Sequence, residues 1–275
     1  MIAFNGQYLP AASHGNMRIT AACLGGQWVI GGKNWLVAAT QQAIIAAFGA
    51  EEGKAVISRT NDYLNALVLT DPTRAQQISG FINEDPMLVC SLVETSKTRW
   101  LVNDGKPYID TGFVPTKDTS IEIMYDKQGK ENYPYSSAVS YNSQSFETYN
   151  NELHFGIIAN VKGISDGKVH MWSNRNQYWW TNNGVEYSHI FPVYNGIFPY
   201  TFYLYALHRA SVFTSVNPLK MWFFKIWDND QLVRHFVPCQ HGNEAGMLDI
   251  ISGTFYPNAN TQGSFTIAIT DKTHA

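Results

Sequence analysis

Charged residues are scarce in this chain of 275 amino acids. Lysine, arginine, aspartate and glutamate make up 15% of it, against roughly 25% in a typical soluble domain, and the net charge is −3. The sequence has no run of lysines or arginines, so it lacks the basic surface that binding to a phosphate backbone requires. We therefore expect no nucleic acid as a partner.

Cysteines are few, and long apolar runs are absent. The three cysteines, Cys23, Cys90 and Cys239, are odd in number and far apart, so we expect reduced thiols and no disulfide framework. No apolar run approaches the roughly 18 residues of a membrane span, which argues against membrane insertion. The opening "MIAFNGQYLPAASHGNMRIT" lacks the basic start and apolar core of a signal peptide, so we expect the protein to fold in a cytoplasm.

Aromatic residues, in contrast, make up 14% of the chain, which predicts a partly neutral or aromatic surface of the kind often buried against other chains. The composition changes near residue 100, from a first part rich in alanine and glutamine to a second part rich in aromatic and β-branched residues. We place a boundary there, with a smaller mixed α+β region over residues 1–97 and a β domain over residues 98–275.

The first part carries helical spacing in two segments. In "NWLVAATQQAIIAAFG", Leu36, Ala39, Ala43 and Ala47 recur at three- and four-residue steps, with Ile44 and Phe48 beside them and Gly49 as the stop. In "TDPTRAQQISGFINED", Asp71 is expected to cap a helix with Pro72 at its first position and an apolar stripe of Ile78, Phe81 and Ile82. The run "CLGGQWVIGGKN" suits a strand or hairpin better than a helix.

The second part reads as many short strands, which predicts a sandwich or barrel. The segment "TSIEIMYDK" places Ile121, Ile123 and Tyr125 on one face, and "YTFYLYAL", "KMWFFKIW" and "QLVRHFV" are further strand-like runs. The turn "DND" from Asp228 to Asp230 predicts a hairpin, and Pro238 is expected to end its second strand. Further turns are expected at "GNEAG" and "ISG", before a last short strand in "TFYPN".

Four motifs of the second part occur in order: "YIDTGFVP" from Tyr108, "KIWDNDQLVRHFVPC" from Lys225, "GMLDIISGTFYPN" from Gly246, and a closing "GSFTI". They resemble the motifs of the concanavalin A-like, laminin-G-like jelly-roll module, which is common in surface proteins of gut bacteria and in structural proteins of their phages. The resemblance covers roughly residues 98–270. The chain departs from the family pattern at His235, where the family usually has aspartate, and at Ile250.

The resemblance implies two antiparallel sheets packed face to face, with the first and last strands side by side. It also implies that the shared motif residues define the fold and do not form a catalytic set: Tyr108, Asp110, Thr111, Gly112, Arg234, Pro238, Gly246, Asp249, Gly253 and Phe255. Some concanavalin-like folds are retaining glycosidases that present two carboxylates on one strand. Here Glu122 and Asp126 flank Met124, which replaces the central aspartate, and we interpret both carboxylates as solvated, with Asp126 at the start of a loop.

Two metal hypotheses are weak. His235, Cys239 and His241 have zinc-type side chains, but no second cluster supplies a fourth ligand. Loop oxygens of "DND" or "ISDG" suit calcium, yet neither forms a recognised calcium loop. We expect no cofactor, with calcium the one metal left open.

The remaining candidate is the aromatic segment "MWSNRNQYWWTNNGVEY". Flat aromatic faces beside amides are typical of carbohydrate sites, and this segment offers Trp172, Tyr178, Trp179, Trp180, Asn182 and Tyr187. Alternation places Tyr178 and Trp180 on one face and Trp179 on the other, so at least one of them belongs to the core. Sandwich packing or subunit contact remains the alternative interpretation of this group.

Two functions follow as expectations. In the first, the protein is not an enzyme but a structural component of a phage virion, such as a capsid decoration, head fibre or tail protein. Its residues 1–97 dock or assemble with other virion proteins and with copies of the chain, and its jelly roll recognises a surface, possible ligands including a host glycan. In the second, it is a carbohydrate-binding module at a bacterial cell surface. The missing signal peptide favours assembly in the host cytoplasm and hence the virion.

Overall fold

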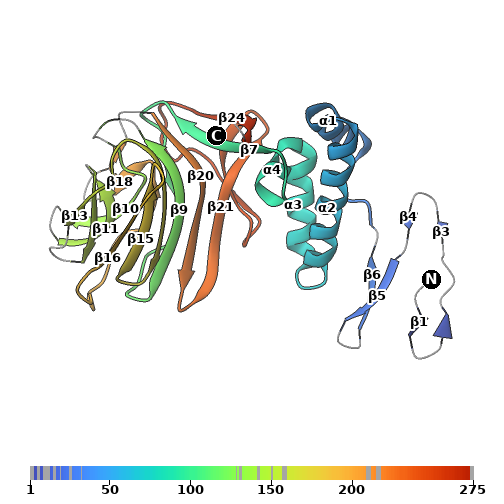
Figure 1. Cartoon of the computed structure of the whole chain (residues 1–275), viewed down its shortest axis with the longest axis horizontal. Coiled ribbons are helices and arrows are strands. Elements are labelled where there is room, and N and C mark those ends of the chain that lie inside the picture. Colours follow the sequence, from blue (N-terminus) through green and yellow to red (C-terminus); the bar gives the residue numbers. More distant parts are fainter. Residues whose placement is uncertain are drawn as a thin grey trace. The chain divides into compact units, whose positions relative to one another are not determined.

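The chain folds as two compact units, Met1–Lys97 and Thr98–Ala275. The computed structural model describes residues 3–4, 7–8, 13–14, 17–18, 20–24, 27–31, 33–127, 129, 132–140, 143–149, 151–156, 160–208, 212–214 and 218–272, with side chains only from residue 33 onward. The protein is mainly β, with 44% strand in antiparallel sheets and 24% helix, and the helices belong to the first unit (Figure 1).

The first unit contains short hairpins and a helical bundle (Figure 1). Its strands are β1 (Ala3–Phe4), β2 (Gln7–Tyr8), β3 (Ser13–His14), β4 (Met17–Arg18), β5 (Thr20–Leu24) and β6 (Gln27–Gly31). Its helices are α1 (Ala38–Phe48), α2 (Ala50–Val68), α3 (Pro72–Glu84), the 3-10 turn η1 (Pro86–Leu88) and α4 (Val89–Leu92). Strands β5 and β6 pair antiparallel, which confirms the hairpin expected from the glycine-bounded run.

Both expected helices form, but the buried face of α1 differs from the prediction. Ile44 is fully buried, whereas Ala39 is exposed and Ala43 half-buried, so the stripe follows four-residue steps through Thr40. The helix stops where expected, because Gly49 has φ 83°, a left-handed conformation that glycine adopts without strain. In α3 the Asp71 side chain accepts a hydrogen bond from the Arg74 N–H at 2.9 Å, which confirms the predicted cap.

Helix α2 was not expected from the sequence. Its buried stripe is Gly53, Val56, Thr60 and Leu64, in which only two side chains are large and apolar. Gly53 is required by close packing, because a Cβ atom there would lie 2.7 Å from the Cα atom of Ile45 in α1. The two helices therefore pack closely through a glycine, and the spacing of apolar residues in the sequence does not reveal this contact.

A cluster of asparagines fixes the segment before α1. The backbone N–H of Trp35 donates to Asn61 at 2.9 Å, and its indole N–H donates to Asn65 at 2.8 Å. Asn83 in α3 donates to the Trp35 carbonyl at 3.1 Å and accepts from the Val37 N–H at 3.0 Å. These bonds join the segment to both α2 and α3, so the helical part of this unit has its own polar ties as well as its own core.

The second unit is built from two large antiparallel sheets and the two-stranded antiparallel sheet β18-β19. The smaller sheet has the order β13-β12-β11-β10-β17-β8, and the larger has the order β16-β15-β14-β9-β20-β21-β22-β23, with β7 paired to β20 and β24 paired to β7. The strands are β7 (Lys97–Asn103), β8 (Ile109–Asp110), β9 (Thr119–Lys127), β10 (Tyr135–Ser140), β11 (Ser143–Tyr149), β12 (Glu152–Gly156), β13 (Asn160–Lys162), β14 (Gly167–Asn174), β15 (Gln177–Asn182), β16 (Val185–Ile190), β17 (Tyr203–Leu204), β18 (Ala206–His208), β19 (Val212–Thr214), β20 (Leu219–Asp228), β21 (Gln231–His241), β22 (Glu244–Asp249), β23 (Thr254–Tyr256) and β24 (Phe265–Asp271).

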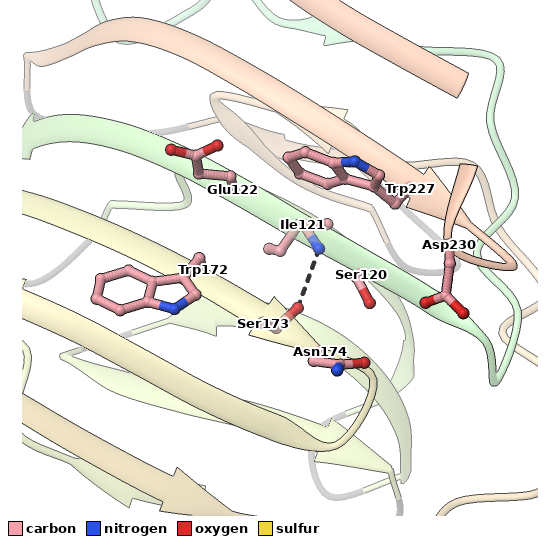
Figure 2. A pocket seen from close by; sticks show the side chains of 8 residues that line it. All are labelled: Ser120, Ile121, Glu122, Trp172, Ser173, Asn174, Trp227 and Asp230. Carbon is pink, nitrogen blue, oxygen red and sulfur yellow. Dashed lines mark hydrogen bonds between the residues drawn. The ribbon is translucent and has the colours of Figure 1, made fainter. Parts of the chain in front are cut away.

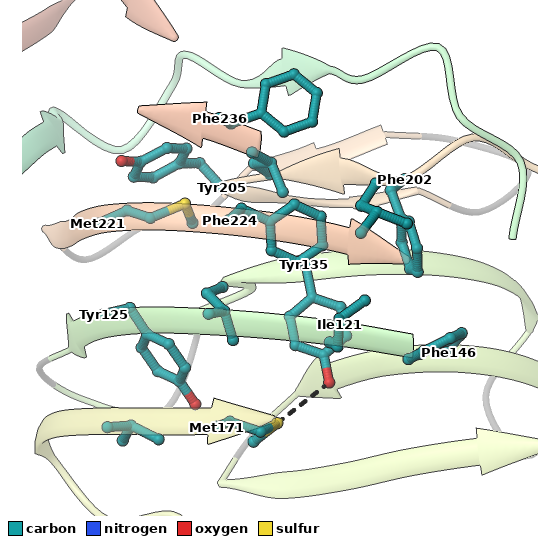
Figure 3. Packing of buried hydrophobic residues seen from close by; sticks show 14 of the residues in the cluster. Ile121, Tyr125, Tyr135, Phe146, Met171, Phe202, Tyr205, Met221, Phe224 and Phe236 are labelled. Carbon is teal, nitrogen blue, oxygen red and sulfur yellow. Dashed lines mark hydrogen bonds between the residues drawn. The ribbon is translucent and has the colours of Figure 1, made fainter. Parts of the chain in front are cut away.

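The core lies between these two sheets. Ile121, Ile123 and Tyr125 of β9 are fully buried, as the alternating pattern predicts. They face aromatic side chains of the smaller sheet, where Tyr135 stacks on Phe224 of β20 with ring centroids 5.8 Å apart (Figure 3). A single aromatic cluster thus joins both sheets. The opposite face of β9 and of its neighbouring strands points away from this core.

The hairpin formed by β20 and β21 confirms the expected turn and corrects one detail. Asp228 pairs with Gln231, so the turn proper is Asn229 and Asp230, both with positive φ. Pro238 does not end β21, which runs on to His241. It is tolerated because the pairing of β21 with β20 ends at Phe236, beyond which β21 pairs only with β22 and a missing N–H costs no ladder bond.

The stretch "GNEAG" is also more strand-like than expected. Glu244 already belongs to β22 and pairs with His241, so the turn is confined to Gly242 and Asn243. Gly246 lies inside β22, where a Cβ atom would come within 2.4 Å of the Tyr256 carbonyl oxygen. Its role is therefore close strand packing, which no side chain larger than hydrogen permits.

The remaining motif residues lie in turns and pairings. Asp110 accepts from the Gly112 N–H at 2.9 Å, Gly112 has φ 65°, and the Thr111 hydroxyl donates to the Phe202 carbonyl at 2.8 Å. The Tyr108 ring stacks on Tyr203 at 4.7 Å, the Phe255 ring lies 5.3 Å from that of His241, and Gly253 has φ 71°. Arg234 forms an ion pair with the buried Asp249 at 3.6 Å.

Candidate functional site

The face of the larger sheet that points away from the core carries a row of side chains across five strands. Opposite residues in the register are Trp179 of β15, Trp172 of β14, Glu122 of β9, Lys225 of β20 and His235 of β21. Directly opposite residues in antiparallel strands lie on the same face, so the row runs perpendicular to the strands.

A pocket of about 430 Å³ opens on this face between β14 and β20. Its lining residues are Ser120, Ile121, Glu122, Trp172, Ser173, Asn174, Trp227 and Asp230. Figure 2 shows the two indole rings on either side of β9, the strand that carries Glu122 and Ser120, with Asn174 and Asp230 toward one end. Because β9 separates the two outer strands, their backbones lie roughly 10 Å apart, which leaves room for a flat ligand between the rings.

Trp172 is the more exposed wall of this pocket, with 39% of its surface accessible. Its ring stacks on Trp179 of the next strand, with centroids 6.3 Å apart and planes inclined by 13°. The two indoles therefore form a platform that continues from the pocket toward β15. A flat apolar platform of this kind contacts the C–H faces of sugars or other planar groups.

Glu122 is an ionised acceptor at the floor of the pocket. Its Oε1 lies 2.9 Å from His170 Nε2, and its Oε2 accepts from the Lys225 ammonium at 2.8 Å. The His170 hydrogen bond, together with Lys225, lowers the pKa of Glu122 to about 2 against the opposing effect of burial. The carboxylate is thus fixed in orientation and charged at neutral pH, with lone pairs left to accept from a ligand.

The other polar groups of the pocket include both hydrogen-bond donors and hydrogen-bond acceptors. The Ser120 hydroxyl oxygen accepts from the Arg175 N–H at 3.0 Å, which leaves its own O–H to donate. Asp230, whose side chain is 77% exposed, pairs with the Arg175 guanidinium at 3.3 Å. Asn174 is exposed and supplies an amide that can donate and accept.

The aromatic segment named from the sequence divides between the two faces of the sheet. Tyr178 and Trp180 are buried in the core at 0% and 2% accessibility, as alternation predicts for that face. Asn182 is buried and accepts from the Ser165 N–H and hydroxyl. Tyr187 is 40% exposed but stacks on Trp180 at 5.4 Å, away from the pocket. Of the six residues, Trp172 and Trp179 belong to the pocket and its platform.

Sequence reasoning missed Trp227, Ser120 and Asp230 as carbohydrate-site residues, and it interpreted Glu122 as solvated. Asn174 belongs to the aromatic segment that the sequence singled out, and it does line the pocket. The side chain of Glu122 is 22% exposed and doubly bonded, and Asp126 lies within β9, paired with Lys220 at 3.1 Å. A signal was present in the alternation, which places Ser120 and Glu122 together on the outward face of β9.

The proposed metal ligands are not brought together. His235 and His241 are six residues apart on one strand, a distance of roughly 20 Å, and Cys239 between them is buried. In the part of the chain that the structure describes, no group of three or more histidine, cysteine, aspartate or glutamate side chains is placed to hold a metal. Asp228 of "DND" accepts from the Thr116 hydroxyl at 2.7 Å, and Asp166 of "ISDG" from the Lys127 ammonium at 3.2 Å.

We expect His235, where the resembled family has aspartate, to make the stability of the β unit depend on pH. Burial, reinforced by the positive charge of Lys225, lowers the pKa of His235 to about 4. Between pH 6.5 and 4 the unfolded chain binds a proton that the folded chain does not, so we expect stability to fall by up to about 3 kcal/mol as pH falls through this window.

Urea denaturation at several pH values checks this expectation. His235→Asn should flatten the pH dependence between pH 6.5 and 4, whereas His241→Asn, at the exposed end of the same strand, should keep the wild-type slope. Equal slopes for His235→Asn and wild type would show that folding does not lower the pKa of His235.

No family model matches the chain, and no curated protein matches it. The described helices are all too short or too polar to span a lipid bilayer. The fold and site together define a mainly β protein whose larger antiparallel sheet carries a pocket flanked by two tryptophans.

Proposed function

We propose that the chain is a non-enzymatic structural protein of a phage particle, and that its β unit recognises a surface carbohydrate. The observation that carries the recognition is the placement of Trp172 and Trp227 on either side of β9, the strand that carries Glu122 and Ser120. Sugars present apolar C–H faces and polar hydroxyls together, which suits indole walls above a floor of fixed acceptors and donors.

The charge state of the floor supports binding without hydrolysis. A glycosidase needs one carboxylic acid that is protonated at working pH, with its pKa raised. Glu122 has the opposite shift, to about 2, because His170 and Lys225 stabilise its ionised form. Asp230, the second carboxylate of the pocket, is largely exposed and paired with Arg175.

A jelly-roll form of the β unit is part of this proposal. Supporting it are the shared aromatic core between two antiparallel sheets and the pairing of β7 with β24, the first and last strands of the unit. The Tyr108 carbonyl also accepts from the Ala259 N–H at 2.8 Å, which joins the opening motif to the end of the "TFYPN" motif. These contacts agree with a concanavalin-like or laminin-G-like module.

The virion setting rests on the resemblance and on composition. A low charge content and many aromatic residues suit permanent contacts with other subunits. The helical first unit, with its own core and polar ties, is the part we assign to docking and self-assembly. The alternative is a carbohydrate-binding module at a bacterial surface. Such a module would be a monomer and would bind its carbohydrate through the same pocket.

Loss of one tryptophan tests the glycan site. Trp172→Ala should weaken binding to a printed panel of bacterial, fungal and plant surface glycans by at least ten-fold, because it removes one wall and half of the platform. Tyr187→Ala is the matched control: its side chain is exposed to the same degree, 40% against 39%, but lies outside the pocket. If no glycan on the panel binds the wild type, or if both variants lose binding equally, the glycan site is wrong.

Light scattering on the full chain tests the setting. We expect a trimer or larger assembly for residues 1–275 and a monomer for a chain that begins at residue 98. Monomers in both cases would contradict the docking role of the first unit and favour the stand-alone binding module.

A further inference from the structure

We propose that the pocket between Trp172 and Trp227 selects sugars without negative charge and excludes uronic acids and sulfated sugars. This inference rests on the proposed glycan function and names the class of sugar that the same site takes. It follows from the signs of the charges that line the pocket and from the direction of the hydrogen bonds they can make.

The charged side chains that line the pocket are both anionic. They are Glu122 at the floor and Asp230 at one end, and among the described residues no lysine, arginine or histidine is part of the lining. A carboxylate or sulfate on the ligand would therefore approach two like charges. Water screens the largely buried Glu122 less than the exposed Asp230.

The basic side chains nearest the pocket are already engaged. Lys225 and His170 each contact one Glu122 oxygen, at 2.8 Å and 2.9 Å, and Arg175 binds Asp230 at 3.3 Å. An acidic sugar that approached Lys225 or Arg175 would compete with Glu122 or Asp230 for the same cation. These donors thus hold the acceptors of the pocket in place.

Hydrogen bonding points the same way. Ionised carboxylates only accept, so Glu122 and Asp230 require donors from the ligand. Sugar hydroxyls are donors, whereas a carboxylate or sulfate group has none. The Ser120 O–H and the Asn174 amide supply the few donors that a neutral sugar needs for its ring and linkage oxygens.

Matched sugar pairs test the selection on the full chain. The probes are immobilised glucan and glucuronan, galactan and galacturonan, and mannan and mannuronan oligomers, with the methyl ester of each acidic member. In each pair whose neutral member binds, we expect the acidic member to bind at least ten-fold more weakly at low salt. The methyl ester should recover binding, and added salt should narrow the gap because it screens the repulsion.

Asp230→Asn should reduce the difference in affinity between acidic and neutral sugars, because it removes one negative charge that repels the acidic sugar. Asparagine tolerates the positive φ of 62° at this position, so the turn is kept. Glu186→Gln, the same charge change at an exposed position of β16 outside the pocket, should leave the ratio at its wild-type value.

The outcomes separate the two proposals. An acidic oligomer that binds as tightly as its neutral partner, through Trp172, overturns the charge selection and leaves the glycan site standing. If no oligomer binds in a Trp172-dependent way, the glycan site fails and the selection fails with it.

Discussion

Replacing Asp249 by alanine is expected to lower the free energy of unfolding of the β unit by about 3–5 kcal/mol. The Asp249 carboxylate is fully buried, yet it accepts from the His235 N–H at 2.8 Å, the Ile251 N–H at 3.0 Å and the Ser252 hydroxyl at 2.7 Å. Arg234 adds an ion pair. Alanine would leave two backbone donors without their acceptor and Arg234 without its partner.

Hydrogen exchange of the His235 and Ile251 amides, together with urea denaturation, measures this loss. Asp249→Asn is the matched control. It keeps one acceptor oxygen for the two N–H groups but loses the charge, so its cost should fall between wild type and Asp249→Ala. If Asp249→Ala unfolds at the wild-type urea concentration, then the turn between β22 and β23 is held by strand pairing alone.

The strands of the β unit could be predicted because their signals are local. The period of two in "TSIEIMYDK" identified the buried face of β9, and "DND" supplied residues that tolerate the positive φ of a tight hairpin. The same period divided Tyr178 and Trp180 from Trp179. In each case the alternation of side chains along a single strand identifies its two faces, and the neighbouring strands need not be known.

The pocket could not be predicted because its walls meet only through strand order. Trp172 and Trp227 are far apart in the sequence, and they become neighbours because β9 is inserted between β14 and β20. Pro238 was misjudged for a similar reason. Its tolerance depends on β20 exchanging one partner, β7, for another, β21, along its length. Such a change of pairing partner cannot be recognised from the sequence of either strand alone.

Helix α2 shows a different limit. Sequence patterns detect helices through large apolar residues at three- and four-residue steps. In α2 the buried positions include Gly53 and Thr60, neither of which contributes a large apolar side chain to the pattern, and the absence of a side chain at Gly53 lets α1 approach closely. The Thr60 hydroxyl donates to the Val56 carbonyl at 2.8 Å, so even its polarity is satisfied within the helix.

Lys127→Met is expected to destabilise the β unit by about 2–3 kcal/mol. The Lys127 side chain is only 1% exposed, and burial lowers its pKa. Its ammonium donates to the Gly129 carbonyl at 3.1 Å, to the Asp166 carboxylate at 3.2 Å and to the Asn151 side-chain oxygen. One cation thus ties together the connections that follow β9, β11 and β13, whereas methionine would fill the same space and bond to none of them.

Urea denaturation of Lys127→Met and Asp166→Asn distinguishes two contributions to stability: the hydrogen bonds of Lys127 to Gly129 and Asn151, and its ion pair with Asp166. Asp166 is 58% exposed, so its carboxylate is well solvated and its replacement should cost less than about 1 kcal/mol. A large loss for Lys127→Met with a small one for Asp166→Asn is the expected result, because the two amide-type oxygens would then account for most of the stabilisation. Equal losses would mean that the ion pair dominates, and no loss for either would mean that strand register alone holds these three connections.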